Sequence, residues 1–436
     1  MSEFTQQLVH ICHPSTREIP PDVRRIARHS LLDWLSVLVG GFEQPVTQIA
    51  LEEALENGSQ PQATLPGSCQ RLSLRDAARI NGIASHALDF DDTHLPSRVH
   101  PSTPLWPALL AQGEMLDLPG QRVTEAFVAG VEMQSRLAAV FGESHYARGW
   151  HNTATLGTFG AAYACGVLLQ LSQPQLVTAL GIAASFTSGP RLQFGCDAKA
   201  LQCGSAAANG LYAARLAQRG LSAHQALFDE ASGFIRLIAA SSLRYIDTER
   251  WFTRDIVYKF HASCYGTQAP IVAAQSLAPK ALPVGKIHVW IEPQYLDVCN
   301  IASPATLNEA RFSVRHMVAM ALLDRDTVSE VGLRDSLTDS AVAALRGRIE
   351  VEGDSSLVRA SARLQLSNGE SISAEMNKPE KDHHKQWARL QQKSEYLLSP
   401  RFNPSCIKQI HESICQLDEG VAVKALCSLL TPEESH

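Results

Sequence analysis

The spacing of apolar residues constrains the fold of this chain more than any other feature of its sequence. Between Val23 and Leu38, apolar side chains recur every three or four residues until Gly40 and Gly41 interrupt the run, a pattern typical of a buried helix. Comparable patterns fill the first two-thirds of the chain. They predict helices at 104–116, 123–141 and 174–186, and a long alanine-rich helix that ends at Gly220. The small residues at 155–162 predict a helix that packs closely at the centre of the bundle.

Strand-like alternation first appears near residue 270. Residues 286–292, 348–352 and 362–367 alternate between apolar and polar side chains, and Asn368-Gly369 then supplies a hairpin turn. An amphipathic helix is predicted at 310–323, between the first two of these strands. After about residue 395 helical spacing returns at 406–417 and 421–430. These last helices could rejoin the first domain, so the second, α+β domain would be an insertion.

Composition and charge exclude several classes of partner. The chain has 436 residues, of which 45% are hydrophobic, and a net charge of −6 without a basic cluster, which argues against nucleic acid. The longest apolar runs, such as 31–39, are too short to span a membrane and include Asp33. The first residues lack the features of a signal peptide, so we expect a cytoplasmic location. A small-molecule substrate is therefore the default expectation.

The cysteines indicate neither disulfides nor a zinc site. Ten of them are scattered at irregular spacing, several in apolar surroundings, as expected for reduced thiols. The sequence contains no CxxC pair and no HExxH motif, so no metal site of these types is predicted.

The densest cluster of acid–base groups is the segment 89–102, which follows a predicted helix capped by Ser73 and Asp76. It contains three carboxylates, two imidazoles, one guanidinium and three hydroxyls, and Pro96 and Pro101 prevent a regular helix at its centre. A polar segment attached to a buried helix is well placed to present catalytic groups. The alternative is a solvated loop in which Asp91 and Asp92 only cap the backbone.

Three further polar segments lie at helix starts or interruptions and can converge with the first on one cleft. They contain His151, Lys199, and the pair Lys259 and Cys264. A cleft with two lysines, two imidazoles and an arginine suits a substrate with several carboxylates, because charge-assisted hydrogen bonds to carboxylates are strong and directional. An imidazole there can transfer a proton near neutral pH.

Other interpretations of these residues were weighed. No Gly-x-Ser-x-Gly motif supports a serine nucleophile, and a nucleophilic role for Cys264 stays open, because closeness in sequence to a histidine says nothing of the fold. A histidine at a helix end is more often a structural hydrogen-bonding group than a catalyst. That structural role is expected for His13, His29, His86, His224, His316, His383 and His384.

The motif Asp-Phe-Asp-Asp-Thr…His-Pro-Ser at 89–102, with Gly149-Trp150-His151 running into 157–162, resembles the MmgE/PrpD family of 2-methylcitrate dehydratase, cis-aconitate decarboxylase and iminodisuccinate epimerase. The resemblance extends to the Lys199 region, to 258–260 and to 304–313, and so covers nearly the whole chain. It implies a mainly α protein: a large all-helical domain formed by both chain ends, 1–265 completed by 396–436, with a smaller inserted α+β lid domain at 266–395. It also implies a homodimer without metal or organic cofactor.

Members of this family remove or relocate a proton next to a carboxylate of a small polycarboxylic acid. Carried over by motif, His100 or His151 is the proton-transfer group, Asp89 and Thr93 orient the site, and Lys199 and Lys259 bind substrate carboxylates. Arg98 and Cys264 are further candidates for substrate contact. Asp91, Asp92 and His94 are expected to shape the loop.

The sequence departs from the decarboxylases of this family at three places. The loop from Thr93 to His100 is one residue longer than in the animal decarboxylases and shorter than in bacterial methylcitrate dehydratases. Cys264 stands where the decarboxylases have a histidine, and a decarboxylase tyrosine aligns with Val298 rather than Tyr295. We therefore predict a hydro-lyase of the 2-methylcitrate dehydratase type. The alternatives are an epimerase of the iminodisuccinate type, an enzyme like cis-aconitate decarboxylase, and a non-catalytic polycarboxylate-binding protein.

Overall fold

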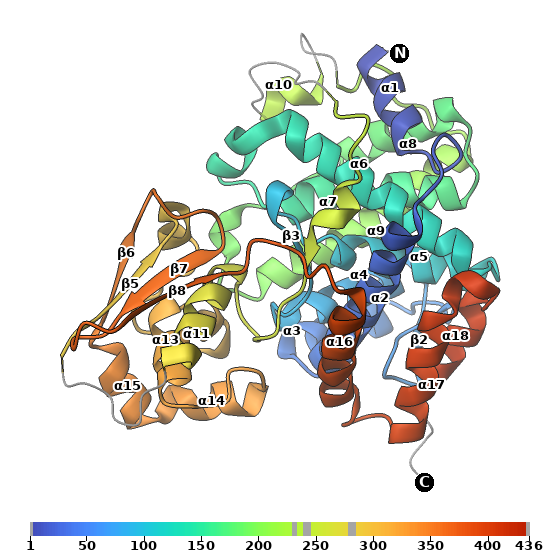
Figure 1. Ribbon diagram of the computed structural model, residues 1–436. Coiled ribbons are helices and arrows are strands. Elements are labelled where there is room, and N and C mark those ends of the chain that lie inside the picture. Colours follow the sequence, from blue (N-terminus) through green and yellow to red (C-terminus); the bar gives the residue numbers. More distant parts are fainter. Residues whose placement is uncertain (1–2, 229–232, 239–245, 278–284, 433–436) are drawn as a thin grey trace.

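The computed structural model describes residues 3–228, 233–238, 246–277 and 285–432, and it is mainly helical with one small sheet (Figure 1). This confirms the predicted mainly α class. The helices before the sheet are α1 (Glu3–Cys12), α2 (Pro21–Gly41), α3 (Pro45–Glu56), α4 (Leu74–Ala87), α5 (Ser102–Met115), α6 (Gly120–Ala147), α7 (Asn152–Leu168), α8 (Gln173–Ala184), α9 (Ala198–Gln218) and α10 (Phe234–Ile238).

Helix α7 is central to this helical part, as its small residues predict, and packs against α5, α6, α8 and α9. The close approach depends on side chains without bulk. A Cβ on Gly210 in α9 would lie 2.4 Å from the Cβ of Ala161 in α7, and one on Gly82 in α4 would lie 2.7 Å from the Cα of Gly204 in α9. Small residues thus bring together α4, α7 and α9, whose N- or C-terminal ends carry the polar segments.

Two short strand pairs, β1 (Ala63–Thr64) with β2 (Arg71–Leu72) and β3 (Thr93–His94) with β4 (Ile256–Val257), lie within the helical part. In the second pair Thr93 is opposite Val257, which places the 89–102 segment beside the segment that carries Lys259. This long-range pairing brings two of the predicted polar segments into contact.

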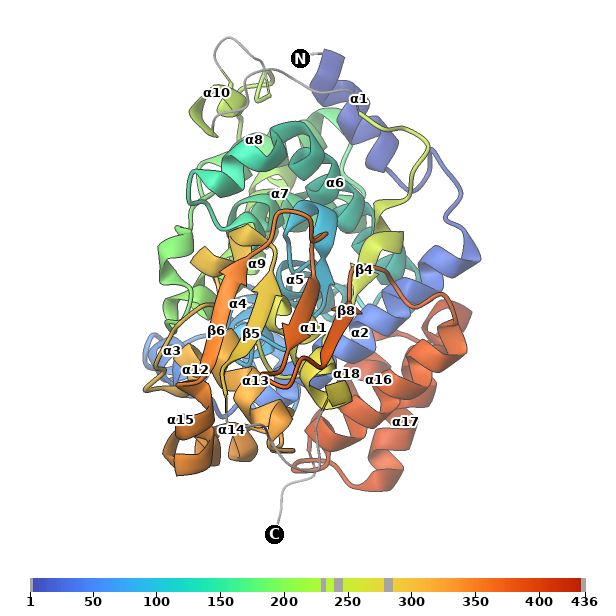
Figure 2. The ribbon, with the colours of Figure 1, turned by 60° about the vertical axis from the view of Figure 1, so that its left-hand side comes forward.

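The sheet has the order β6-β5-β7-β8, formed by β5 (Ile287–Ile291), β6 (Ile349–Gly353), β7 (Ser361–Gln365) and β8 (Ser371–Glu375). Only β5 and β6 are parallel. The predicted hairpin at Asn368-Gly369 joins β7 to β8, with Gly369 at φ +90°. Helices α11 (Tyr265–Leu277) and α13 (Val314–Leu322) pack against the strands of this sheet (Figure 2). The buried residues of β5 share one hydrophobic core with residues of these two helices. The same region contains α12 (Leu307–Arg311), α14 (Glu330–Thr338) and α15 (Ser340–Arg346).

The amphipathic helix predicted at 310–323 is present as α13, but it begins later than predicted, because α12 ends at Arg311. The hydroxyl of Ser313 accepts a hydrogen bond from the backbone N–H of His316 and so starts a new helix. The helix predicted at 123–141 is longer than predicted, since α6 continues through His145 and Tyr146 to Ala147.

The chain ends in α16 (His383–Leu398), α17 (Pro404–Cys415) and α18 (Val423–Leu429). Helices α16 and α17 pack against α2, and α18 packs against α5, so the last three helices lie against the N-terminal helical part (Figure 1). The domain boundary proposed at 395 falls inside α16. Among the described residues, no helix combines the length and the apolar composition that crossing a membrane requires.

Candidate active site

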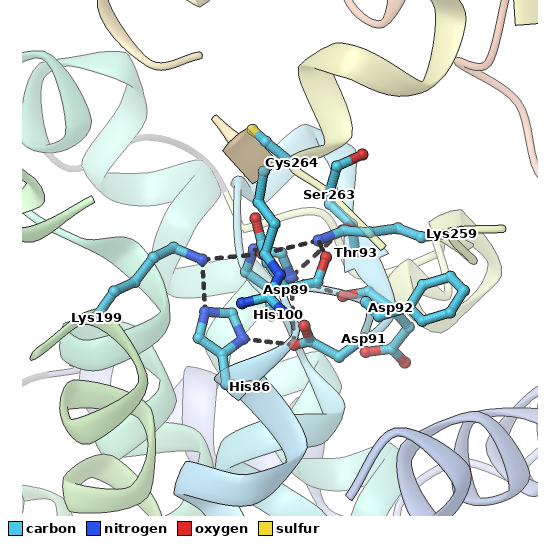
Figure 3. A network of polar contacts seen from close by, with 12 residues as sticks. His86, Asp89, Asp91, Asp92, Thr93, His100, Lys199, Lys259, Ser263 and Cys264 are labelled. Atoms are coloured by element: carbon cyan, nitrogen blue, oxygen red, sulfur yellow. Dashed lines mark hydrogen bonds and ion pairs between the residues drawn. The ribbon is translucent and has the colours of Figure 1, made fainter. Parts of the chain in front are cut away.

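Asp89 lies at the centre of a buried network of charged groups (Figure 3). It follows the end of α4 in the left-handed backbone region, with φ 48°. Its Oδ1 accepts hydrogen bonds from Nζ of Lys199 at 3.0 Å and Nζ of Lys259 at 2.9 Å. Burial raises the pKa of Asp89, but the two ammonium groups lower it by more, so the pKa lies well below its usual value. The carboxylate therefore stays ionised.

Lys259 is completely buried and binds Asp89 twice, because its Nζ also donates to the Asp89 carbonyl at 2.7 Å. Lys199, in the first turn of α9, donates in addition to Nε2 of His86 at 2.6 Å. Only Lys199 of the two lysines lines the cavity described below.

His100 is held as a neutral base. Its Nδ1 lies 2.9 Å from the carbonyl oxygen of Asp92, and since a carbonyl only accepts, Nδ1 carries the proton and Nε2 keeps its lone pair. Burial lowers the pKa of His100 to about 3, an effect that Asp91 opposes and the nearby lysines reinforce. Nε2 lies 4.0 Å from Oδ1 of Asp89. Thr93, on β3, places its hydroxyl 3.4 Å from Nδ1 of the same ring.

His151 immediately precedes α7 and has the same tautomer. Its Nδ1 lies 2.7 Å from Oε1 of Gln202, and Nε2 of Gln202 donates to the carbonyl of Pro190 at 3.1 Å, which fixes the amide oxygen toward the imidazole. Burial, followed by the charge of Lys199, keeps the pKa of His151 well below its usual value. Its Nε2 has no hydrogen-bond partner in the described part of the chain. The site thus holds two neutral imidazoles with free Nε2 lone pairs.

His86 belongs to this network, which corrects the purely structural role expected for it. Its Nδ1 binds Oδ2 of Asp91 at 2.9 Å, so the ring connects Lys199 to Asp91. The ring centroids of His86 and His100 are 4.7 Å apart. His86 precedes Asp89 by three residues in the sequence, on the last turn of α4, and that spacing is the signal that could have identified it.

The neighbouring carboxylates do shape the loop, as expected, and one also contacts the imidazoles. Asp92 binds Ser102 at the start of α5, with 2.6 Å between Oδ2 and the hydroxyl, and burial raises the pKa of Asp92 to about 8. His94 closes its own turn through Ser97. Asp91 accepts from Thr103 at 2.7 Å and lies 3.4 Å from Nδ1 of His100.

A cavity of about 60 Å³ adjoins this network, and its volume is several times the minimum that one water molecule requires. Its walls come from both the helical part and the sheet region. The lining residues are Asp89, Thr93, Leu95, Arg98, His100, Tyr146, His151, Phe194, Lys199, Cys264, Tyr265, Tyr295, Val298, Phe312 and Arg359. All the predicted site residues except Lys259 therefore meet at one cavity. Tyr295 and Val298 both line it, although they were proposed as alternatives in the alignment.

The protein's own cations occupy the donor atoms that a metal ion would need. Ligand atoms of His86, Asp89, Asp91 and His100 lie within 4.8 Å of one another. Oδ1 of Asp89 already accepts from two ammonium groups, and Nε2 of His86 accepts from one of them. The donor set consequently fits the lysine ammonium groups better than a divalent ion.

A buried aspartate held by two lysines, beside two neutral imidazoles and a cavity, is an arrangement that can transfer protons on an anionic ligand. Residues 7–244 match the MmgE/PrpD N-terminal domain, and residues 261–417 match the MmgE/PrpD C-terminal domain. The chain therefore belongs to the MmgE/PrpD family, which confirms the resemblance seen in its motifs.

Several similar proteins in this family are named cis-aconitate decarboxylase. The one from Aspergillus terreus is 26% identical over 96% of this chain and 95% of its own length. The one from Homo sapiens is 30% identical over 68% of this chain and 66% of its own, and the one from Mus musculus is 31% identical over 69% and 65%. The similarity to the fungal protein thus spans both family domains.

Proposed function

We propose that this protein is a cofactor-independent lyase that acts on a small polycarboxylic acid by removing a proton next to a carboxylate. The observation that carries the proposal is His100, whose Nε2 is free while Nδ1 donates to the Asp92 carbonyl. With its pKa lowered to about 3 by burial, the imidazole is an unprotonated base at neutral pH. Lys199 lies beside it to bind the substrate carboxylate.

In the proposed reaction, Nε2 of His100 takes the proton from the carbon next to that carboxylate. The negative charge that develops on the carboxylate is stabilised by the ammonium of Lys199, which Asp89 holds in place while Lys259 holds Asp89. A hydroxyl group on the neighbouring carbon then leaves with the proton as water, and a carbon–carbon double bond forms. His151 is the second candidate for the proton-transfer group.

Dehydration of the 2-methylcitrate type is the form of the reaction that we favour. Nε2 of each imidazole carries no proton, because Nδ1 donates to the Asp92 carbonyl in His100 and to Gln202 in His151. Both rings can therefore accept a proton from carbon, whereas decarboxylation has to deliver one. Decarboxylation of cis-aconitate is the second candidate, because that is the activity in the names of the similar proteins. An epimerase would share the first step and return the proton to the opposite face.

Three further properties are part of the proposal. The helical part formed by both chain ends is the body of the enzyme, and the sheet with its helices is a lid over the cavity. The active form is a homodimer, and its location is the cytoplasm. No nucleic acid or membrane takes part in the reaction.

The test is incubation in D2O with 2-methylcitrate, citrate, cis-aconitate and iminodisuccinate, followed by NMR, with His100→Asn as the matched control. Loss of water with formation of an alkene, absent in the control, would support dehydration. Release of CO2 would show that the reaction is decarboxylation and not dehydration. Exchange of a substrate hydrogen for deuterium with inversion of configuration, but without an alkene, would show that the reaction is epimerisation. A protein that binds these acids without changing any of them would contradict the lyase proposal as a whole.

A further inference from the structure

Four charged side chains at one end of the cavity are not used in the proposed reaction. We call them the arginine–glutamate cluster: Arg98, Glu143, Glu292 and Arg359. Arg98 follows the 3-10 turn η1 (Leu95–Ser97) and Glu143 lies on α6, whereas Glu292 follows β5 and Arg359 precedes β7. The cluster therefore joins the helical part to the sheet region across the cavity.

Glu143 is shared by the two arginines. One carboxylate oxygen lies 3.1 Å from Nε of Arg98, and the other lies 2.8 Å from a terminal nitrogen of Arg359. Glu292 is farther from both, at 3.7 Å from Arg98 and 3.9 Å from Arg359. Burial raises the pKa of Glu143, but the two guanidinium groups lower it by more, so Glu143 remains an anion.

The members of the cluster differ in exposure. Both arginines line the same cavity as His100 and Lys199, and the side chain of Arg98 is only 9% exposed. The side chain of Glu143 is 57% exposed, so water can solvate its carboxylate if a substrate carboxylate replaces it at the two arginines. Nε of Arg359 and Oε2 of Glu292 are buried without a hydrogen bond in the described structure. Arg359 thus has an unused buried donor that a second carboxylate can satisfy.

More positive charge surrounds the same end of the cavity. Tyr146, another lining residue, has the guanidinium of Arg98 4.8 Å from its ring centroid and that of Arg191 at 4.5 Å. Three arginines against two glutamates leave this part of the cavity wall with a net positive charge.

We infer that Arg98 and Arg359 form a second carboxylate site, at which a substrate carboxylate displaces Glu143. This inference rests on the proposed function and specifies its substrate class: an acid with one carboxylate beside the reacting carbon at Lys199 and another that reaches the two arginines. Arg359, in this view, determines specificity, and Glu143 is the internal competitor of the substrate. A guanidinium fork suits a carboxylate because it can donate two parallel hydrogen bonds.

The competing interpretation is that the cluster only fastens the sheet region to the helical part. The two interpretations predict opposite effects for Glu143→Gln. If Glu143 competes with substrate, neutralising it tightens the binding of polycarboxylates. If it is only a fastening, neutralising it loosens the cavity wall and weakens binding.

Binding of propane-1,2,3-tricarboxylate, measured by titration calorimetry, tests the inference without requiring turnover. We expect Arg359→Met and Arg98→Met each to weaken it roughly 10- to 100-fold, the scale of a lost hydrogen bond to a charged group. Arg359→Lys should be only a partial substitute, because an ammonium lacks the fork. Binding of the monocarboxylate butanoate, followed by NMR titration, should be unchanged in all three variants, and Glu143→Gln should tighten the tricarboxylate.

Arg363→Met is the matched control, because Arg363 lies on β7 close to Arg359 but pairs with Asp354 away from the cavity. Equal binding by Arg359→Met, Arg363→Met and the unmodified protein would overturn the inference, as would weaker binding by Glu143→Gln. The outcome is separable from the proposed function. Tight binding that depends on the arginines, without turnover, would contradict the proposed lyase function and support the second carboxylate site. Turnover with binding that does not depend on the arginines would support the lyase function and contradict the second carboxylate site.

Discussion

Lys393 and Asp33 form a buried ion pair, with 2.6 Å between Nζ and Oδ1, although 360 positions separate them in the sequence. The ammonium of Lys393 also donates to the carbonyls of Phe90 at 2.7 Å and Lys259 at 3.1 Å. Phe90 follows Asp89, so one side chain from α16 holds the backbone of both partners in the Asp89–Lys259 pair. The end of the chain thereby positions the candidate active site.

Replacing Lys393 by Met should lower the free energy of unfolding by about 3–5 kcal/mol, because Asp33 would remain buried without its partner. Urea unfolding measures this change, and Lys385→Met, on the exposed side of the same helix, is the control. The double variant Lys393→Met/Asp33→Leu should recover stability but not turnover, since the carbonyls of Phe90 and Lys259 still lack their donor. Full turnover in the double variant would show that Lys393 has no positioning role.

Replacing His100 by Asn should reduce kcat by roughly 10²- to 10⁴-fold, the usual contribution of general acid–base catalysis, and His151→Asn should do so if it shares the proton transfer. Binding of propane-1,2,3-tricarboxylate should persist in both variants, which separates loss of chemistry from loss of the site. The measurement is steady-state kinetics on the substrate identified by NMR. Near-normal kcat in both variants would remove the imidazoles from the mechanism.

Local patterns in the sequence were sufficient for the helices and for most of the candidate site. Asp89, Thr93 and His100 could be found because they fall within one short motif, and Lys199 and His151 because each lies at a helix start. Helical spacing and the preference of polar groups for helix ends located these segments, and the resemblance to the family assigned their roles. The start of a new helix at Ser313 was not predicted, because the spacing of apolar residues gives no information about a single capping hydroxyl.

Contacts between distant segments could not be predicted in this way. The pairing of Thr93 with Val257 turns Lys259 toward Asp89 rather than toward the cavity, and nothing local to Lys259 indicates that direction. Gln202 fixes the tautomer of His151 from 51 positions away, and Arg359 reaches the cavity from the loop before β7. These roles depend on packing between elements, which a single sequence does not specify.

The buried histidines should make the protein less stable as the pH falls. Burial, reinforced by His383 and Arg25, lowers the pKa of His29 to about 3 from its usual value of 6.5. Below pH 6.5 the unfolded chain therefore binds a proton that the folded protein does not, and stability is lost from pH 6.5 down to about 3. In His29→Leu the free energy of unfolding should fall less steeply with decreasing pH, by the contribution of about one bound proton. Urea unfolding midpoints measured between pH 7 and 4 give this dependence.

Ser30→Ala is the control for that experiment, because it removes a neighbouring buried side chain that does not titrate in this range. It should shift the urea midpoint by the same amount at every pH. An unchanged pH dependence in His29→Leu would mean that His29 is protonated to the same extent in the folded and unfolded states.

Replacing Cys264 by Ser should leave turnover at the same order of magnitude, because the proposed proton transfer forms no covalent intermediate. The thiol lines the cavity, and its hydrogen bond with the Cys299 thiol lowers the pKa of Cys264, so a nucleophilic role is the alternative to test. Kinetics of Cys264→Ser, with the exposed Cys415→Ser as control, should be accompanied by intact-mass measurement of the unmodified enzyme during turnover. Loss of activity in Cys264→Ser together with a substrate-derived mass on the protein would establish covalent catalysis and displace His100 from the first step.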